Sequence, residues 1–215
     1  SVKALVTTRH GGVSQSPWAS LNLGDHVGDA PEAVRENRRR LRSLLPAEPV
    51  WLKQVHGTVC LDAATASNGA EADAIWTRER NVVCTVMTAD CLPLLLCDDA
   101  GAVVAAAHAG WRGLAAGVIE SAVGAMTVAP TRLLAWIGPA IGANAFEVGE
   151  DVRETFLRLD PKSGAAFVAK AGGKFWCDLA ALARERLSAL GVRRITSADL
   201  CTVGDPDRFY SFRRD

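Results

Sequence analysis

The sequence predicts one domain of the α/β or α+β class over residues 1–215. Short apolar runs that are typical of strands are interleaved with segments of helical period along the whole chain. With 215 residues, of which 49% are hydrophobic, the chain is long and apolar enough to bury one substantial core. It contains no internal repeat, no low-complexity tract and no convincing linker, so a single unit is the simplest interpretation.

The N-terminal part of the chain predicts one strand, a long polar loop and one helix. Residues 2–8 alternate in the manner of an edge strand. The loop then runs to about Asp29, which is expected to cap a helix with Pro31 in its first turn. We interpret the arginines over 35–40 as a solvated face of this helix, which ends before Pro46.

The middle of the chain predicts mainly strands that end at polar turns. Short strands over 50–55 and 58–61 flank the turn that contains His56, and a loop follows over 68–73. Further strands are expected over 82–87, 92–98 and 102–108. The turn at 98–101 indicates that the last two of these strands pair as a hairpin.

The remainder of the chain predicts alternating helices and strands. A helix over 114–126 has an apolar stripe, and a buried strand over 133–137 stops at Gly138-Pro139. Two more helices are expected over 148–159 and 178–190, and Gly191 closes the second as its C′ residue. Shorter strands are expected over 165–168 and 193–198.

Composition and charge exclude several classes of partner. The chain has 24 basic and 24 acidic residues, so its formal charge of zero gives no electrostatic basis for binding nucleic acid. No apolar run approaches the roughly 20 residues that a membrane helix needs. Residues 1–6 are too short and strand-like for a signal peptide. We therefore expect a cytoplasmic protein without nucleic-acid or membrane partners, either a monomer or a weak homodimer.

The six cysteines form no recognisable zinc-knuckle or redox motif, because no pair has the two-residue spacing of those motifs. Most lie in apolar surroundings, where free cysteine acts as a small hydrophobe. A disulfide framework is not expected at this length in the cytoplasm. Cys91 differs from the others because Asp90 precedes it and Leu92-Pro93 follows.

Two histidines and this cysteine lie where apolar runs give way to turns. They are His56, Cys91 and His108, separated by 35 and 17 residues, so only the fold could bring them together. Two imidazoles and a thiol suit zinc and also copper. Three protein ligands leave the fourth position open, as a catalytic zinc site requires, and zinc lowers the pKa of bound water to about 7. Asp90 would then support the ligands or carry a proton.

Simpler interpretations of the same residues stay open. A single histidine in an apolar context is more often a packed, hydrogen-bonded residue than a ligand, since short motifs match by chance. Cys91 could instead be the nucleophile of a metal-independent hydrolase, with His108 or His56 as its base. Asp90 could be an ordinary carboxylate at a strand end.

Eight short motifs occur in order along the chain and are jointly typical of one family. They are Thr7-Thr8-Arg9-His10-Gly11-Gly12-Val13-Ser14, Ser20-Leu21-Asn22-Leu23, Gln54-Val55-His56-Gly57, Ala72-Asp73-Ala74, Thr88-Ala89-Asp90-Cys91-Leu92-Pro93, His108-Ala109-Gly110-Trp111-Arg112-Gly113, Ile137-Gly138-Pro139-Ala140-Ile141 and Phe209-Tyr210-Ser211-Phe212-Arg213-Arg214. With them the chain closely resembles the YfiH/YlmD family of bacterial proteins over nearly its whole length. The family was formerly described as multicopper polyphenol oxidoreductases, or laccases. It is now described as purine nucleoside phosphorylases with adenosine deaminase activity.

The resemblance implies a layered α/β fold with mixed sheets flanked by helices, similar to the deamidase domains of cytotoxic necrotizing factors. It also implies that His56, Cys91 and His108 are the zinc ligands of a buried cleft. Family members usually continue beyond the position of Asp215 with a short glycine-containing tail, and this chain departs from them there.

The activities implied by the resemblance are phosphorolysis of adenosine, inosine and methylthioadenosine, and deamination of adenosine. Phosphate would be held against the anomeric carbon, and Arg9 and Arg112 are the candidates because arginine binds phosphate bidentately. Asn22 could hydrogen-bond the ribose or the base. Asp90 and Arg112 are the candidate catalytic residues. A surface or structural ion pair is the alternative role for each arginine.

A multicopper oxidase is difficult to reconcile with the histidine count. Such an enzyme needs a blue-copper site and a separate copper cluster, whereas this chain has four histidines and only His10 and His26 remain beyond the triad. Copper could still occupy the zinc site, and any oxidase activity would then be adventitious. Two further alternatives are a Cys91/His108 amidase, as peptidoglycan editing by related proteins would suit, and a regulatory protein with a structural zinc.

Overall fold

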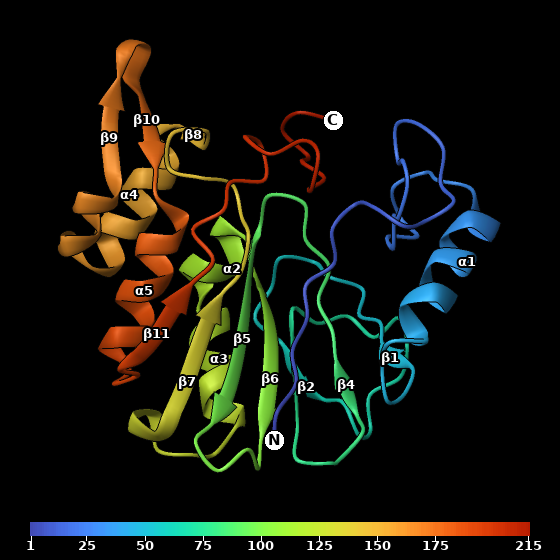
Figure 1. The fold of residues 1–215 in the computed structure, drawn as a ribbon. Coiled ribbons are helices and arrows are strands. Elements are labelled where there is room, and N and C mark those ends of the chain that lie inside the picture. The colour runs from blue at the N-terminus through green and yellow to red at the C-terminus, as the bar shows by residue number, and fades with distance from the viewer.

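A six-stranded mixed sheet forms the centre of the computed structural model, which describes residues 1–215 (Figure 1). Its strand order is β11-β7-β5-β6-β3-β2. The strands are β2 (Cys60–Asp62), β3 (Ala74–Thr77), β5 (Leu92–Asp98), β6 (Val104–Ala109), β7 (Leu133–Ile137) and β11 (Arg194–Ser197). The four central strands pair antiparallel, while each edge strand is parallel to its neighbour. The mixed sheet and its helices confirm the predicted fold class.

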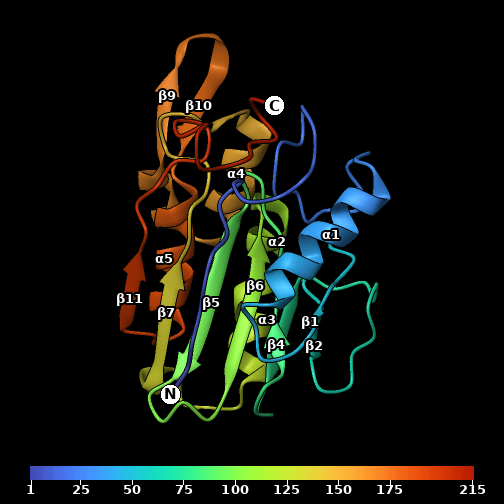
Figure 2. The ribbon, with the colours of Figure 1, turned by 45° about the vertical axis from the view of Figure 1, so that its right-hand side comes forward.

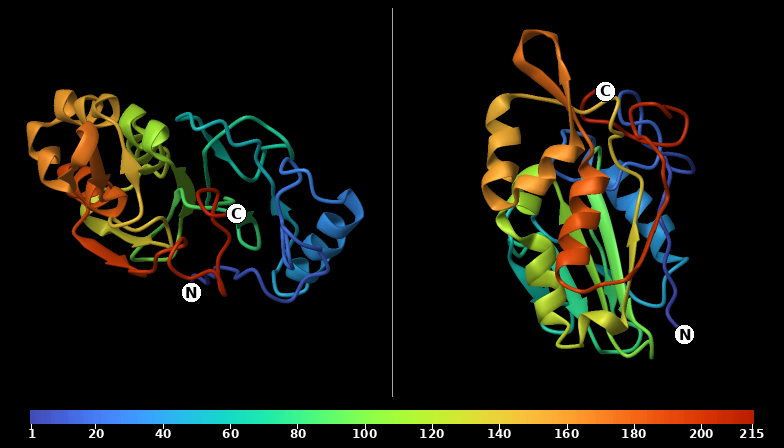
Figure 3. Two further views of the ribbon diagram at one scale, coloured as in Figure 1. Left: turned by 90° about the horizontal axis from the view of Figure 1, so that it is seen from above. Right: turned by 90° about the vertical axis from the view of Figure 1, so that its left-hand side faces the viewer.

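Helices cover one face of this sheet, and the N-terminal segment crosses the other (Figure 3). The helices on the covered side are α2 (Trp111–Ala116), α3 (Val118–Ala125), α4 (Glu150–Leu159) and α5 (Leu179–Ala189). Alternation along β5 points Leu92, Leu94 and Leu96 into the core that these helices close. None of the helices has the length and the apolar run that a bilayer crossing needs.

Two small sheets flank the central one. Strands β1 (Pro49–Val50) and β4 (Val83–Cys84) are parallel and lie beside α1 (Pro31–Arg42), at the end of the central sheet where β2 is the edge (Figure 2). At the other end, β8 (Glu147–Val148), β10 (Lys174–Cys177) and β9 (Phe167–Lys170) form an antiparallel sheet whose β9–β10 hairpin projects from the body (Figure 1). Short 3-10 helices occupy Pro130–Arg132, Pro161–Ala166 and Ala171–Gly173.

Several predicted elements are confirmed closely. The strands over 92–98 and 133–137 coincide with β5 and β7, and β5 pairs with β6 as the expected hairpin. In α5, the Asp178 side chain accepts a hydrogen bond from Ala181 N, and Gly191 follows the helix with a φ of 95°. These elements carry strong local signals, namely a long apolar run, a cap and a glycine stop.

Other predictions were wrong. Residues 2–8 form no strand, because no neighbouring strand pairs with them, and Val2, Leu5 and Val6 stay exposed. The helix expected over 114–126 begins at Trp111 and breaks at Gly117, whose φ of 105° interrupts the helical path between α2 and α3.

The short elements were also misjudged. Strands β3, β8 and β10 were not predicted, and the two strands around the His56 turn shrink to β1 and β2. Asp29 does not cap α1: its carboxylate accepts a hydrogen bond from Ala30 N, and Ala30 occupies the N-cap position. Strands this short have too few residues to show a period.

Candidate metal centre

The fold brings His56, Cys91 and His108 together at one end of the central sheet. Their ligand atoms all lie within 4.8 Å of one another, and Cys91 Sγ is 3.6 Å from His56 Nε2. The rings of His56 and His108 meet edge to face, with centroids 4.7 Å apart. The structure contains a single such group of three or more potential ligands, and His10 and His26 are outside it.

Strand register explains why Cys91 and His108 meet. Cys91 immediately precedes β5, and the antiparallel register pairs Leu92 with Ala109 and Pro93 with His108. Asp73 immediately precedes β3 on the other side of β6, and its carbonyl accepts a 2.7 Å hydrogen bond from His108 N. Three neighbouring strands therefore present Cys91, His108 and Asp73 at the same end of the sheet.

The Asp73 carboxylate fixes the turn that carries His56. It accepts hydrogen bonds from the backbone N–H groups of Val55 at 3.1 Å, His56 at 2.9 Å and Gly57 at 2.6 Å. His56 itself has a φ of 59°, in the left-handed region that residues with a Cβ seldom adopt. Asp73 is 0% exposed, so its carboxylate depends on these partners.

The same carboxylate orients His108. Its Oδ1 lies 2.8 Å from His108 Nδ1, which leaves Nε2 of that ring free to face Cys91 and His56. A histidine that ligates a metal characteristically donates its other ring N–H to a carboxylate, which fixes the tautomer and the ring plane. The arrangement is therefore that of a ligand histidine with its supporting acid.

The surroundings shift the pKa values of these groups in different directions. Burial lowers the pKa of His108, but hydrogen bonds to Asp73 and Cys91 outweigh it and raise the pKa to about 9. Burial also lowers the pKa of His56, and the nearby positive charges of His108 and Arg112 lower it further. Burial raises the pKa of Asp73, but hydrogen bonds from His108 and the backbone outweigh it, so the net shift is downward.

Close packing holds the loops that carry the three donors. The Gln54 side chain donates to Met87 O at 2.8 Å and accepts from Met87 N at 2.7 Å, which ties the His56 loop to the segment before Cys91. A Cβ on Gly110 would lie 2.8 Å from both Cys91 Sγ and His56 Cδ2, so only glycine fits there.

The donor set fits a transition-metal ion. Bonds of about 2.1 Å to nitrogen and 2.3 Å to sulfur at a tetrahedral angle place the two ligand atoms about 3.6 Å apart, and Cys91 and His56 have this separation. His108 is buried, Cys91 is half-buried and His56 is exposed, so the group opens to solvent on one side. Three donors with an open side are the pattern of a catalytic rather than a structural zinc site.

Arg112 lies beside this centre. It is exposed and stacks on the Trp111 ring at 4.6 Å, and its charge contributes to the lowered pKa of His56. Trp111, Arg112, Thr155 and Arg158 are among the residues that line an open depression between α2 and α4. A guanidinium free to meet an anion is therefore available near the three donors.

Two residues expected to contact substrate, Asn22 and Arg9, form hydrogen bonds within the protein. Asn22 closes its own loop: its amide donates to Gly24 O at 3.0 Å and to Asp29 Oδ2 at 2.9 Å, and its Oδ1 accepts from Gly24 N at 3.0 Å. Both amide hydrogens are used, so the prediction that Asn22 binds ribose or base receives no support from the structure.

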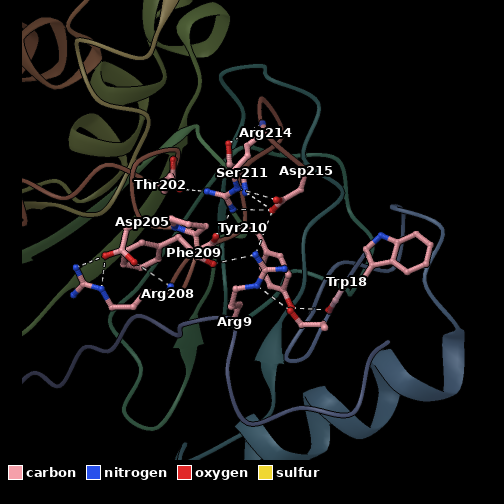
Figure 4. Close-up of polar contacts among 12 residues, drawn as sticks. Arg9, Trp18, Thr202, Asp205, Arg208, Phe209, Tyr210, Ser211, Arg214 and Asp215 are labelled. Atoms are coloured by element: carbon pink, nitrogen blue, oxygen red, sulfur yellow. Dashed lines mark hydrogen bonds and ion pairs between the residues drawn. The ribbon is translucent and has the colours of Figure 1, made fainter. Parts of the chain in front are cut away.

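Arg9 joins the N-terminal loop to the C-terminal segment (Figure 4). Its guanidinium donates to Ala19 O at 2.9 Å and to Pro206 O at 3.1 Å, lies over the Tyr210 ring and sits 3.6 Å from Asp215. These contacts give Arg9 the structural role that was the alternative to phosphate binding, and phosphate binding by Arg9 stays a prediction.

The Asp90 carboxylate is bonded to the C-terminal segment and not to the three candidate ligands. Its carboxylate accepts hydrogen bonds from Thr202, Ser211 and Arg213 in the C-terminal segment. Sequence reasoning missed the roles of Asp73 and Gln54, although both belong to quoted motifs. The signal for Asp73 was a carboxylate between two alanines next to an apolar run, a context in which a charge needs internal partners.

Comparison with known proteins identifies the family of the chain. The family model described as multi-copper polyphenol oxidoreductase laccase matches residues 3–215. The chain belongs to this family. Within the structure, one group of three potential metal ligands is present, formed by His56, Cys91 and His108.

Curated relatives in this family support an enzymatic role. A Pseudomonas aeruginosa protein named purine nucleoside phosphorylase is 54% identical over 99% of this chain and 88% of its own length. The Escherichia coli protein named purine nucleoside phosphorylase YfiH is 51% identical over 100% of this chain and 89% of its own length.

Solved structures share the fold. Neisseria meningitidis protein NMB0706 superposes with a TM-score of 0.94 at 51% identity, covering 98% of this chain and 87% of its own. YlmD from Geobacillus stearothermophilus superposes with a TM-score of 0.88 at 33% identity, covering 97% of this chain and 84% of its own.

Proposed function

We propose that this chain is a zinc-dependent purine nucleoside enzyme. It would cleave adenosine, inosine and methylthioadenosine with phosphate, releasing the free base and the sugar 1-phosphate, and would also deaminate adenosine. The observation that carries the proposal is the open-sided set of His56, Cys91 and His108 with Asp73 behind it. The names of relatives at 51 and 54% identity supply the substrate class.

The metal would be held by Nε2 of both histidines and by Sγ of Cys91. Thiolate and imidazole together suit zinc, and copper would compete for the same donors. When bound, zinc supplies Lewis acidity at its open position, for activating water or polarising a substrate. Asp73 keeps the proton on His108 Nδ1 and holds the His56 turn, so the ligands are preorganised.

Arg112 is the proposed phosphate ligand. In phosphorolysis a phosphate oxygen bonds to the anomeric carbon, the glycosidic C–N bond breaks, and the base leaves with the electron pair and takes up a proton. A bidentate guanidinium would hold the phosphate against that carbon and neutralise its charge. Arg112 stacks on the Trp111 ring and not on an acidic side chain, so its charge is available. Deamination instead needs water to replace the amino group at C6.

The arrangement of Cys91, His108 and Asp73 without a metal favours a second candidate function, that of a cysteine hydrolase. Cys91, His108 and Asp73 are arranged as a nucleophile, a base and an orienting acid, which is the pattern of a cysteine hydrolase. In such an enzyme the raised pKa of His108 would favour an imidazolium beside a thiolate. Metal binding and this chemistry use the same atoms, so the two functions exclude each other in one molecule.

One experiment separates these functions. Zinc-quantified protein is incubated with adenosine and phosphate, and adenine, inosine and hypoxanthine are resolved, for the wild type beside His56→Ala and Cys91→Ala. We expect adenine that depends on phosphate, inosine that does not, and the loss of both in each variant and after chelation. Hydrolytic activity that survives chelation but is abolished by thiol alkylation would favour the cysteine hydrolase. Bound zinc with no turnover of any nucleoside would favour a regulatory protein.

A further inference from the structure

The C-terminal segment, residues 200–215, folds over the end of β5 where Cys91 lies. Arg214 organises this segment: its guanidinium donates to the carbonyls of Thr202 at 2.7 Å, Val203 at 3.1 Å and Phe209 at 2.7 Å, and it pairs with Asp215 (Figure 4). These bonds link the two ends of the segment, so it behaves as one unit.

Asp90 is the point at which this segment contacts the chain beside Cys91. Its Oδ1 accepts a hydrogen bond from Thr202 Oγ1 at 2.6 Å, and its Oδ2 accepts from Ser211 Oγ at 2.9 Å and Arg213 N at 2.8 Å. Asp90, Thr202 and Ser211 are 8%, 4% and 0% exposed, so water cannot replace these partners. Each partner lies more than 110 residues from Asp90 along the chain.

The backbone of Asp90 is also constrained. Its φ is 82°, in the left-handed region that is unfavourable for a residue with a Cβ, and its carbonyl accepts a 2.9 Å hydrogen bond from Ile141 N. A conformation of this kind persists only where the surroundings fix it. The next residue is Cys91, so the orientation of the Asp90 backbone sets the direction of the thiol.

We propose that Asp90 is a positioning residue, through which the C-terminal segment holds Cys91 as a metal ligand. The inference rests on the proposed function only in taking His56, Cys91 and His108 as ligands. Asp73 supports the two histidines, and Asp90 supports the cysteine, so each kind of ligand has its own buried carboxylate. Asp90 acts through hydrogen bonds and not as a proton carrier.

The chemistry of asparagine allows a sharp test. In Asp90→Asn, the amide NH₂ can donate to Thr202 Oγ1, because a hydroxyl also accepts, while the remaining oxygen still accepts from Ser211 and Arg213. Asp90→Ala removes all three bonds. We expect Asp90→Ala to bind zinc about 10- to 100-fold more weakly in competition with a chromophoric chelator. The thiolate-to-metal band of its cobalt-substituted form should also change, while Asp90→Asn stays within a few-fold of the wild type.

Asp98 supplies the matched control, because it is a buried carboxylate at the opposite end of β5. It is 4% exposed and accepts from Ala102 N at 2.6 Å and Val103 N at 3.1 Å. Asp98→Ala should lower thermal stability yet leave zinc affinity unchanged. The double variant Thr202→Val with Ser211→Ala removes the hydroxyl partners of Asp90 and keeps Asp90 itself. Its zinc affinity tests the inference if Asp90→Ala does not fold.

The outcomes are distinct. Wild-type zinc affinity and cobalt spectrum in Asp90→Ala, or in the double variant, would overturn the inference. Equal losses of zinc affinity in Asp98→Ala and Asp90→Ala would also overturn it, since they would indicate a general loss of stability. A wild-type protein that binds no zinc would overturn it as well. Wild-type protein that binds zinc but does not turn over nucleosides would refute the proposed function and leave this inference standing.

Discussion

The Asp73 carboxylate and the His108 imidazole share a 2.8 Å hydrogen bond, and the carboxylate also holds the turn that presents His56. Both Asp73 oxygens accept from N–H donors that cannot accept in return: Oδ1 from His56, and Oδ2 from Val55 and Gly57. A single buried carboxylate therefore positions two of the three candidate ligands.

Asp73→Asn should weaken zinc binding about 10- to 100-fold. Either orientation of its amide turns an NH₂ group toward a backbone N–H, so at least one side of the contact breaks. Chelator competition measures the effect. Asp90→Asn is the control, because its partners tolerate the amide, and comparable zinc affinities in the two variants would contradict this account.

Zinc affinity should rise with pH between about 6.5 and 9. His108 with a pKa of about 9 carries a proton at neutral pH that zinc must displace, so its protonation weakens binding by about tenfold per unit of pH below that value. The pKa of His56 is lowered, so His56 does not compete above pH 7. Competition titrations across this range provide the measurement, and an affinity independent of pH would be inconsistent with a protonated His108.

Gly110→Ala should abolish or strongly weaken metal binding. Gly110 has a φ of −64°, which alanine adopts freely, so the effect is steric: the new Cβ would lie 2.8 Å from Cys91 Sγ and His56 Cδ2. Gly124→Ala is the matched control, since nothing lies within 4 Å of its Cβ position in α3. That change should raise stability by about 0.5–1 kcal/mol. Zinc content and thermal melting of both variants test the contrast.

Arg112→Ala should raise the KM for phosphate at least tenfold while zinc content stays that of the wild type, because Arg112 lies beside the donors without contacting them through a hydrogen bond. Phosphate-dependent adenine release is the assay. Arg35→Ala on α1 removes another exposed charge and should change nothing. A loss of deamination equal to that of phosphorolysis would argue against a phosphate-specific role.

Sequence reasoning selected the three side chains that the structure brings together, because histidine and cysteine are chemically conspicuous at strand ends. It could not foresee the internal contacts of Arg9 and Asn22, because an arginine or an amide that closes a loop has the same local sequence as one that binds a ligand. Their partners, such as Pro206 and Asp29, become visible only in three dimensions.

The sequence by itself determined the α/β class, the strands β5 and β7 and the helix α5, and it singled out His56, Cys91 and His108 as candidate ligands. These depend on local signals: apolar period, caps, glycine stops and side-chain chemistry. The tertiary structure alone decided that the donors converge, that Asp73 supports the histidines and that Asp90 faces the C-terminal segment. Each of these depends on strand register or on contacts between distant segments. A hydrogen bond between side chains more than 110 residues apart produces no pattern in the sequence from which it could be predicted.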